Sequence, residues 1–303
     1  MKDKRIIVTG GAGFIGTNLV EKLVSENEVL VIDNLHTGTN DNLREFESEN
    51  LKVLNSDVKD ISKVDFDADY IFHLGFYSAS PMYRDNPLLT SEVLGGMISV
   101  LEFARERGSN VVFSSTSSIY NGVTPPHKED IIPGVTDFYT EGRIASERAS
   151  ELYNKLFDVN VSAMRFFSVY GYHEKAKGGY ANLATQFLWD MKNGKAPVIY
   201  GDGEQRRDFV FVTDVVDCLI KASQHKGFDV FNVGFGKNYS LNELVEKLNR
   251  LLGTSIEPEY IEMPVKNYVM ETLADTSKAQ RLLGFKAGID LDSGLNLINK
   301  YYR

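Results

Sequence analysis

The segment Thr9-Gly10-Gly11-Ala12-Gly13-Phe14-Ile15-Gly16 joins a β-branched run at 5–9 to a helical pattern at 14–26. Glycines at such a junction let the backbone turn tightly and approach a pyrophosphate, whose charge the helix N-terminus then meets. The next predicted strand, 28–33, ends at Asp33 about 20 residues further on, where a carboxylate accepts hydrogen bonds from an adenosine ribose. The pattern predicts a dinucleotide site, and the negative charge at Asp33 favours NAD over NADP.

Short strands alternate with longer helices through the first half of the chain. We expect further strands at 52–57, 69–74, 110–115 and 159–167, and helices at 88–107 and 139–157. This alternation is typical of parallel βαβ units. The sequence therefore predicts an α/β fold with a Rossmann-like doubly wound parallel sheet in 1–168. The elements of 169–303 are shorter and predict a smaller α/β substrate region, with segments around 209–235 packing back on the first domain.

The composition excludes several classes of protein. The 303 residues are 43% hydrophobic and 25% charged, which is ordinary for a globular chain. A net charge of −9 argues against a nucleic-acid partner, because an acidic surface repels a phosphate polymer. No apolar run approaches the ~18–20 residues that span a bilayer, and the N-terminus does not resemble a signal peptide. With a single cysteine, Cys218, we expect a cytoplasmic protein with no membrane partner and no metal site.

A second group of polar residues follows the predicted strand at 110–115. The run Ser114-Ser115-Thr116-Ser117-Ser118 stands at the carboxyl end of that strand, where ligands bind in open α/β sheets. Taken alone, it also fits an ordinary polar loop. Tyr139 and Arg143 are four residues apart on a predicted helix and share a face. A cation beside a phenol favours the phenolate, which makes the tyrosine a usable base near neutral pH.

The segments at 9–16 (TGGAGFIG) and 31–35 (VIDNL) resemble the extended short-chain dehydrogenase/reductase family. Within it, the chain is similar along essentially its whole length to the NAD-dependent nucleotide-sugar epimerase/dehydratase group. The resemblance implies a homodimer formed through the two long predicted helices. It also implies NAD as the cofactor, bound by Gly10, Gly13, Phe14, Ile15, Gly16, Asp33, Asn34, Asp57, Val58, Leu74, Tyr139 and Arg143.

The resemblance further implies a catalytic role for Tyr139, Arg143 and Thr116. Tyr139 matches the base of the family's YxxxK motif, and Thr116 matches the residue that hydrogen-bonds the reacting hydroxyl. Arg143 departs from the pattern because the family has Lys there; it keeps the positive charge but is larger and planar. Gly75 and Phe76 also depart from it, since the family usually has two alanines after this strand.

A substrate site is implied by the block GDGEQRRDFV at 201–210. In the group that it resembles, the residue corresponding to Arg207 binds the diphosphate of the sugar nucleotide, a task that suits a forked guanidinium. Ser168 stands where the family usually has an Asn, and Lys266 is the candidate to replace a missing C-terminal Arg. The other expected substrate contacts are Thr116, Ser117, Ser118, Asn182, Tyr83 and Arg84.

The residues after Thr116 distinguish the reaction types of this group. Dehydratases have an Asp-Glu pair there and decarboxylases usually keep a Glu at the position of Ser118, whereas small hydroxyl residues resemble 4-epimerases. We therefore predict an NAD-dependent nucleotide-sugar 4-epimerase that acts through a transient 4-keto sugar, with a UDP-hexose as substrate. Two alternatives stay open: a UDP-uronic acid decarboxylase, which Glu141-Gly142 resembles, and a catalytically silent NAD and sugar-nucleotide binding protein, because of Arg143.

Overall fold

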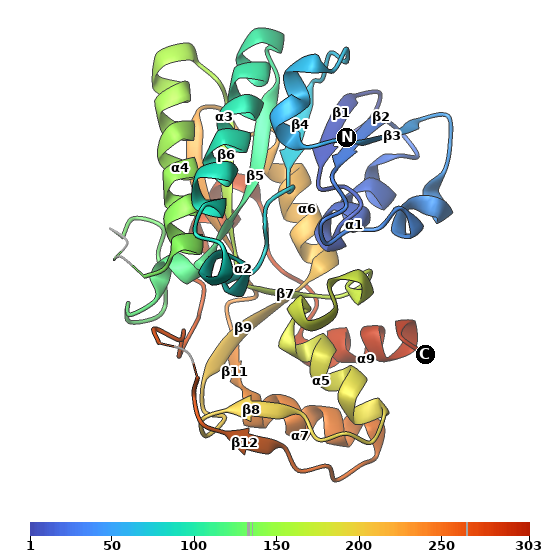
Figure 1. Cartoon of the computed structure of the whole chain (residues 1–303), viewed down its shortest axis with the longest axis vertical. Helices are drawn as coiled ribbons and strands as arrows, with labels where there is room; N and C mark the ends of the chain where they lie inside the picture. The colour runs from blue at the N-terminus through green and yellow to red at the C-terminus, as the bar shows by residue number, and fades with distance from the viewer. Residues whose placement is uncertain (132–133, 135, 265) are drawn as a thin grey trace.

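A seven-stranded parallel sheet forms the centre of the computed structural model, which describes residues 1–303 except 132, 133, 135 and 265. The strand order is β3-β2-β1-β4-β5-β6-β10, and every neighbouring pair is parallel (Figure 1). The strands are β1 (Arg5–Thr9), β2 (Glu28–Asp33), β3 (Leu51–Asn55), β4 (Tyr70–His73), β5 (Asn110–Thr116), β6 (Val161–Phe166) and β10 (Phe228–Val233). This order confirms the predicted doubly wound α/β class.

Helices cover both faces of the sheet. Ile6 and Val8 of β1 pack in the same apolar cluster as α1 (Phe14–Leu23) and α6 (Val212–Ala222), while Ile7 packs in the cluster of α3 (Leu89–Arg107). Alternate strand residues point to opposite faces, so a strand covered on both sides is apolar throughout. Figure 1 shows α4 (Phe138–Phe157) beside α3, and the two helices contact each other.

The predicted strand at 52–57 ends earlier than expected, at Asn55. The Asp57 carboxylate accepts the Lys59 amide at 2.9 Å and starts the short helix η2 (Val58–Lys63). An Asx turn of this kind competes with strand pairing. It places Asp57 and Val58 at the start of η2, beside the edge strand β3.

The residues after Phe166 form a smaller region below the sheet in Figure 1, around a separate apolar cluster. Its strands are β7 (Ser168–Tyr170), β9 (Arg206–Phe211) and β11 (Asn238–Ser240) in one sheet, and β8 (Val198–Tyr200) and β12 (Glu259–Ile261) in another. Its helices are η4 (Lys175–Tyr180), α5 (Leu183–Lys192), α7 (Leu241–Leu252) and α9 (Leu291–Tyr301). β10 nevertheless completes the large sheet and α6 packs on α1, so the two regions are interleaved. The boundary at 168/169 stays a prediction.

The remaining elements are short: η1 (Asn40–Phe46), α2 (Ser80–Asp85), η3 (Ser117–Tyr120) and α8 (Ser277–Leu283). In the described part of the chain, no helix combines the length and the apolar character needed to span a bilayer.

Candidate active site

A cavity of ≈ 650 Å³ lies at the carboxyl ends of the central strands. Thr9, Asp33 and His73 line it at the ends of β1, β2 and β4, and Thr116 lines it at the end of β5. The C-terminal region supplies the opposite part of the lining. Ligands of doubly wound sheets bind at this edge, so the cavity is the candidate active site.

The glycine turn forms one end of the cavity. Gly10 has φ +70°, and a Cβ there would lie 2.6 Å from the Gly75 nitrogen. A Cβ at Gly16 would lie 2.1 Å from the Gly10 carbonyl oxygen. Only glycine fits either position, because the backbones of the turn, of α1 and of the loop after β4 approach one another this closely. Since α1 starts at Phe14 on the cavity wall, its first amides are available to an anion there.

Asp33 is fixed at the end of β2 by two backbone amides. Its carboxylate accepts the Ala12 amide at 2.9 Å and the Leu35 amide at 2.8 Å. Burial raises the pKa of this carboxyl, while the amides of Leu35 and Ala12 oppose the shift. Each carboxylate oxygen keeps a lone pair for a ribose hydroxyl, whereas a second phosphate would meet a negative charge.

The structure brings the expected cofactor residues to one cavity. All of them line it: Gly10, Gly13, Phe14, Ile15, Gly16, Asp33, Asn34, Asp57, Val58, Leu74, Tyr139 and Arg143.

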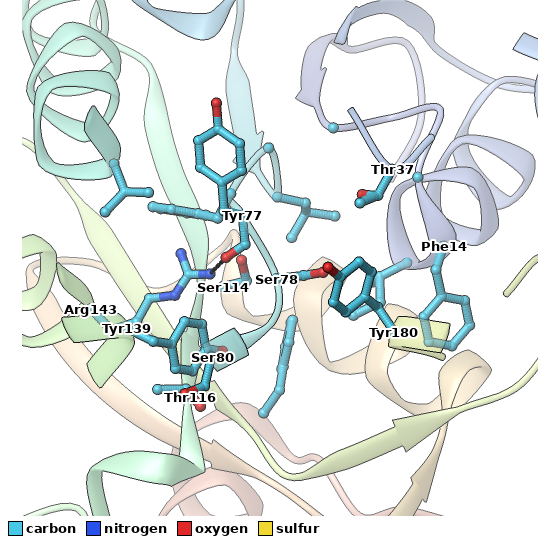
Figure 2. A pocket seen from close by; sticks show the side chains of 18 of the residues that line it. Phe14, Thr37, Tyr77, Ser78, Ser80, Ser114, Thr116, Tyr139, Arg143 and Tyr180 are labelled. Carbon is cyan, nitrogen blue, oxygen red and sulfur yellow. Dashed lines mark hydrogen bonds between the residues drawn. The ribbon is translucent and has the colours of Figure 1, made fainter. Parts of the chain in front are cut away.

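The expected reacting groups gather away from the glycine turn. Figure 2 shows Thr116, Tyr139 and Arg143 at one side of the cavity and Phe14 and Thr37 at the other. The Thr116 hydroxyl accepts the Ser118 amide at 3.1 Å and still has its own proton to donate. Ser117 and Ser118 line the cavity next to it.

Tyr139 lies in the first turn of α4, directly behind a well-held N-cap. The Asp137 carboxylate accepts the Thr140 amide at 2.8 Å, and the Ser80 hydroxyl donates to the same carboxylate at 2.7 Å. The start of α2 is thereby tied to the start of α4. Asp137 and Ser80 also line the cavity, so the helix start that carries Tyr139 forms part of its wall.

Arg143 is only 3% exposed, yet its hydrogen bonding is incomplete. Nη2 donates to the Tyr77 carbonyl at 3.1 Å, and the guanidinium carbon lies 3.9 Å from the centre of the Phe76 ring and 5.1 Å from that of Tyr139. Nε and Nη1 have no hydrogen-bond partner among the described residues. Buried cationic donors without acceptors are costly. Ribose hydroxyls are acceptors of the right kind, so this side chain fits a bound nicotinamide nucleotide.

His73 is buried beside this group and stays neutral. Its Nδ1 shares a 2.6 Å hydrogen bond with the Thr9 hydroxyl, which also accepts the Gly75 amide at 3.2 Å. Burial, helped by the charge of Arg143, lowers the pKa of His73 to about 3. The imidazole therefore adds no positive charge near Arg143 at neutral pH.

Tyr83 requires a correction, because it does not line the cavity. It is 1% exposed, its hydroxyl donates to the Tyr77 carbonyl at 3.0 Å, and its ring lies edge-on to Tyr139 at 5.3 Å between centres. Burial raises the pKa of Tyr83 to about 12, so the hydroxyl remains a donor. It packs edge-on against Tyr139 and supports that ring. Its neighbour Arg84 is exposed and lines the cavity.

The other expected substrate residues come from separate segments of the C-terminal region. Ser168 starts β7, Asn182 caps α5 by accepting the Ala184 amide at 3.0 Å, and Arg207 lies in β9. All three line the cavity, as does Lys266. The Arg207 Nη1 donates to the carbonyls of Arg206 and Met270, at 2.9 and 3.3 Å, which fixes the position of its charge.

Many lining residues were not among those predicted, and four of them are described here. The ring centre of Tyr268 lies 5.2 Å from the guanidinium carbon of Arg207. The Lys177 Nζ lies 5.5 Å from the ring centre of Phe14. Tyr180 and Phe76 also line the cavity. The aromatic and lysine content of 171–180 was visible in the sequence, but it predicts only an irregular loop. The substitution at Phe76 was visible as well, although its contact with Arg143 was not.

Comparisons with known proteins show which family the chain is similar to. The sequence model of the NAD dependent epimerase/dehydratase family matches residues 6–234. UDP-glucuronate 4-epimerase of Thermodesulfobacterium geofontis is 31% identical over 306 residues, covering 95% of this chain and 93% of that protein. UDP-glucuronic acid decarboxylase 1 of Xenopus tropicalis is 29% identical over 309 residues, covering 99% and 72%. The solved structure of UDP-N-acetylglucosamine 4-epimerase from Methanobrevibacter ruminantium M1, in complex with UDP-N-acetylmuramic acid, superposes with a TM-score of 0.94 at 30% identity and covers 100% of this chain and 99% of that one.

Proposed function

This chain belongs to the NAD dependent epimerase/dehydratase family and has NAD as its cofactor, and from that premise we propose that it is a nucleotide-sugar 4-epimerase with a UDP-hexose as substrate. The observation that supports the proposal best is that Tyr139, Arg143 and Thr116 line the same cavity as the glycine turn. The relatives named above include 4-epimerases of UDP-sugars. UDP as the nucleotide and the 4-position as the reacting centre are inferred from these.

The chain's own residues position the sugar and move a proton. Tyr139 accepts the proton of the sugar 4-hydroxyl, and Thr116 donates a hydrogen bond to the same oxygen. Arg143 presents Nε and Nη1 to ribose hydroxyls. When bound, NAD would supply the hydride chemistry at carbon 4. The 4-keto sugar then rotates in the cavity and presents its other face. Tyr139 returns the proton to the oxygen on the inverted carbon. Placement and proton transfer account for the protein's contribution.

The sugar nucleotide is held on the side of the cavity that the C-terminal region forms. Arg207 presents a positive charge there, and its own hydrogen bonds to two carbonyls fix its direction. A guanidinium in this position suits the diphosphate. Ser168 and Asn182 line the same side and supply polar groups for the nucleotide and the sugar.

Two observations favour epimerisation over decarboxylation of a UDP-uronic acid. The position after Ser117 carries Ser118, which has no carboxyl group. The pair Glu141-Gly142, which resembles decarboxylases, has a packing explanation: a Cβ at Gly142 would lie 2.9 Å from Val93 Cγ2, so glycine lets α4 approach α3. Glu141 is not part of the cavity lining. The decarboxylase reading is therefore the second choice, although a relative carries that activity in its name.

The test is turnover of defined substrates followed by proton NMR. Purified protein is incubated with NAD and, separately, with UDP-glucose, UDP-N-acetylglucosamine and UDP-glucuronate. The proposal predicts a sugar inverted at carbon 4, no carbon dioxide and no net NADH. Release of carbon dioxide with formation of a UDP-pentose would identify a decarboxylase. Binding of the substrates without any product would identify a silent binding protein.

We also propose a homodimer formed through α3 and α4. Both helices expose apolar side chains: Ile98 on α3 is 39% exposed, and Leu152 and Leu156 on α4 are 53% and 61% exposed. Exposed apolar side chains on adjacent helices suit an isologous interface. Light scattering during gel filtration tests this. Leu156→Glu is expected to give a monomer, whereas Leu282→Glu, at a 45% exposed position on α8, is expected to leave the dimer intact.

A further inference from the structure

Two of the residues that depart from the family pattern, Phe76 and Arg143, contact each other. The guanidinium carbon of Arg143 lies 3.9 Å from the centre of the Phe76 ring, and the two side chains are 3% and 9% exposed. We propose that Phe76 is a positioning residue, whose ring holds the Arg143 guanidinium in place and makes this site selective for arginine over lysine. The inference rests on the proposed function for the role of Arg143, and on the contact itself for the role of Phe76.

The chemistry of the two cations explains the selectivity. A guanidinium is planar and weakly hydrated, so it can lie against an aromatic ring while the N–H groups at its edges remain free. An ammonium is compact and strongly hydrated, and it gains less from a buried apolar surface. In the observed position, Nη2 of Arg143 donates to the Tyr77 carbonyl, while Nε and Nη1 stay available (Figure 2). The ring therefore fixes the direction of the free donors without occupying them.

The position of the Phe76 ring is itself fixed by the cofactor end of the cavity. The Phe76 amide donates to the Leu74 carbonyl at 2.9 Å, which turns the chain sharply after β4. Gly75 lies within that turn and packs against Gly10. The approach is so close that a Cβ on Gly10 would lie 2.6 Å from the Gly75 nitrogen. The His73 ring packs on Phe76 at 4.1 Å between centres. The same close approach that shapes the pyrophosphate turn thus places the ring that holds Arg143.

The contact determines how substitutions at Arg143 and Phe76 should combine. Arg143→Lys, which would restore the residue implied by the family resemblance, puts an ammonium over the Phe76 ring and is expected to weaken the site. Phe76→Ala removes the ring and leaves the guanidinium without its support. When both changes are combined, the ammonium no longer lies against an apolar surface, because water can enter the space of the lost ring. The double variant is expected to be less impaired than the product of the two single effects.

The experiment measures NAD dissociation constants of the stripped protein and the pH profile of turnover. Phe76→Leu keeps apolar volume without an aromatic face, and we expect it to bind NAD roughly 10- to 30-fold more weakly, with an altered pH profile. Phe76→Tyr keeps the aromatic face. We expect it to keep the NAD affinity and the pH profile of the unmodified protein. The matched control is Phe66→Leu, because Phe66 is 3% exposed and packs on the guanidinium carbon of Arg5 at 4.4 Å, outside the cavity. It is expected to lower the melting temperature without changing NAD affinity.

The inference is overturned if Phe76→Leu binds NAD as tightly as the unmodified protein, or if the effects of Phe76→Ala and Arg143→Lys simply multiply. It is also overturned if Phe66→Leu weakens NAD binding as much as Phe76→Leu, since the effect would then be general destabilisation. NAD affinity does not depend on the sugar. A protein that fails to epimerise any sugar but shows the coupling would therefore contradict the proposed function and leave the role of Phe76 intact.

Discussion

The cavity has two walls that are built in different ways. The wall that we assign to the cofactor, called the cofactor wall, comes from the turn at 10–16 and from Asp33, which lie within one βαβ unit and are held by backbone contacts. The wall that we assign to the sugar nucleotide, called the sugar wall, comes from Ser168, Asn182 and Arg207, which lie in three separate elements of the C-terminal region. The first wall is specified by local sequence, because the turn determines its own geometry. The second depends on how distant segments assemble, so its chemistry can change without loss of the fold.

The largest expected effect lies at the meeting point of the two walls. Tyr139→Phe removes the proposed base and keeps the ring that packs on Tyr83. Loss of a general base costs roughly 10²- to 10⁴-fold in kcat. Turnover assays are expected to show a lower kcat. NAD titration is expected to show a dissociation constant that changes little. Undiminished turnover would show that another group is the base.

The next effect tests the rigidity of the cofactor wall. Gly16→Ala places a Cβ 2.1 Å from the Gly10 carbonyl oxygen, so the turn must shift. Such overpacking costs roughly 1–3 kcal/mol, and we expect both a lower Tm and weaker NAD binding. Gly95→Ala on α3 is the matched control, because nothing lies within 4 Å of a Cβ there. It is expected to be neutral or to stabilise the protein by about 0.5–1 kcal/mol. Equal behaviour of the two variants would contradict the packing argument.

A smaller effect, confined to the sugar wall, is expected at Arg207. Arg207→Ala removes a fixed cation, and hydrogen bonds to charged groups contribute about 1.5–3 kcal/mol. The KM for the sugar nucleotide should therefore rise roughly 10- to 100-fold, with an unchanged NAD dissociation constant. Steady-state kinetics and NAD titration separate the two quantities. A parallel loss of NAD affinity would mean that the two walls are not independent.

The smallest expected effect near neutral pH is a loss of folding stability on acidification, caused by His73 beside the cofactor wall. The pKa of buried His73 is lowered from 6.5 to about 3, so the unfolded chain binds a proton in this range and the folded chain does not. The free energy of unfolding therefore falls as the pH drops from 6.5 toward 3, with a limiting slope of ~1.4 kcal/mol per pH unit. Melting curves at several pH values should show a weaker acid loss for His73→Gln than for the unmodified protein. Parallel curves would show that His73 does not contribute.

The sequence could predict that the residues of the cofactor wall, and the pair Tyr139 and Arg143, lie in one cavity, because their signals are local. The glycine turn, the strand end at Asp33 and the spacing of Tyr139 and Arg143 on one helix each need only a few neighbouring residues. The same reasoning predicted the parallel sheet, because short strands alternate with longer helical patterns through the first half of the chain. The exact strand ends were less accessible: at Asp57 a side-chain hydrogen bond to the Lys59 amide ends the strand run early.

Other features depend on contacts between distant segments and could not be predicted. Tyr83 follows a strand that ends in the site, but its burial behind Tyr139 depends on how α2 packs against α4. The contact of Phe76 with Arg143 joins a loop to a helix. The pairing of Arg207 with Tyr268 likewise joins two remote segments. No periodicity within either segment encodes such a contact.

We propose above that carbon 4 of a sugar is inverted by removal and return of the same hydride, while Tyr139 removes and returns the hydroxyl proton. The most direct measurement follows a UDP-hexose that carries deuterium at carbon 4, with products observed by NMR. The account predicts a 4-epimer that keeps its deuterium at carbon 4, and loss of this product in Tyr139→Phe. An epimer whose deuterium has been exchanged for solvent hydrogen, or inversion at a different carbon, would contradict it.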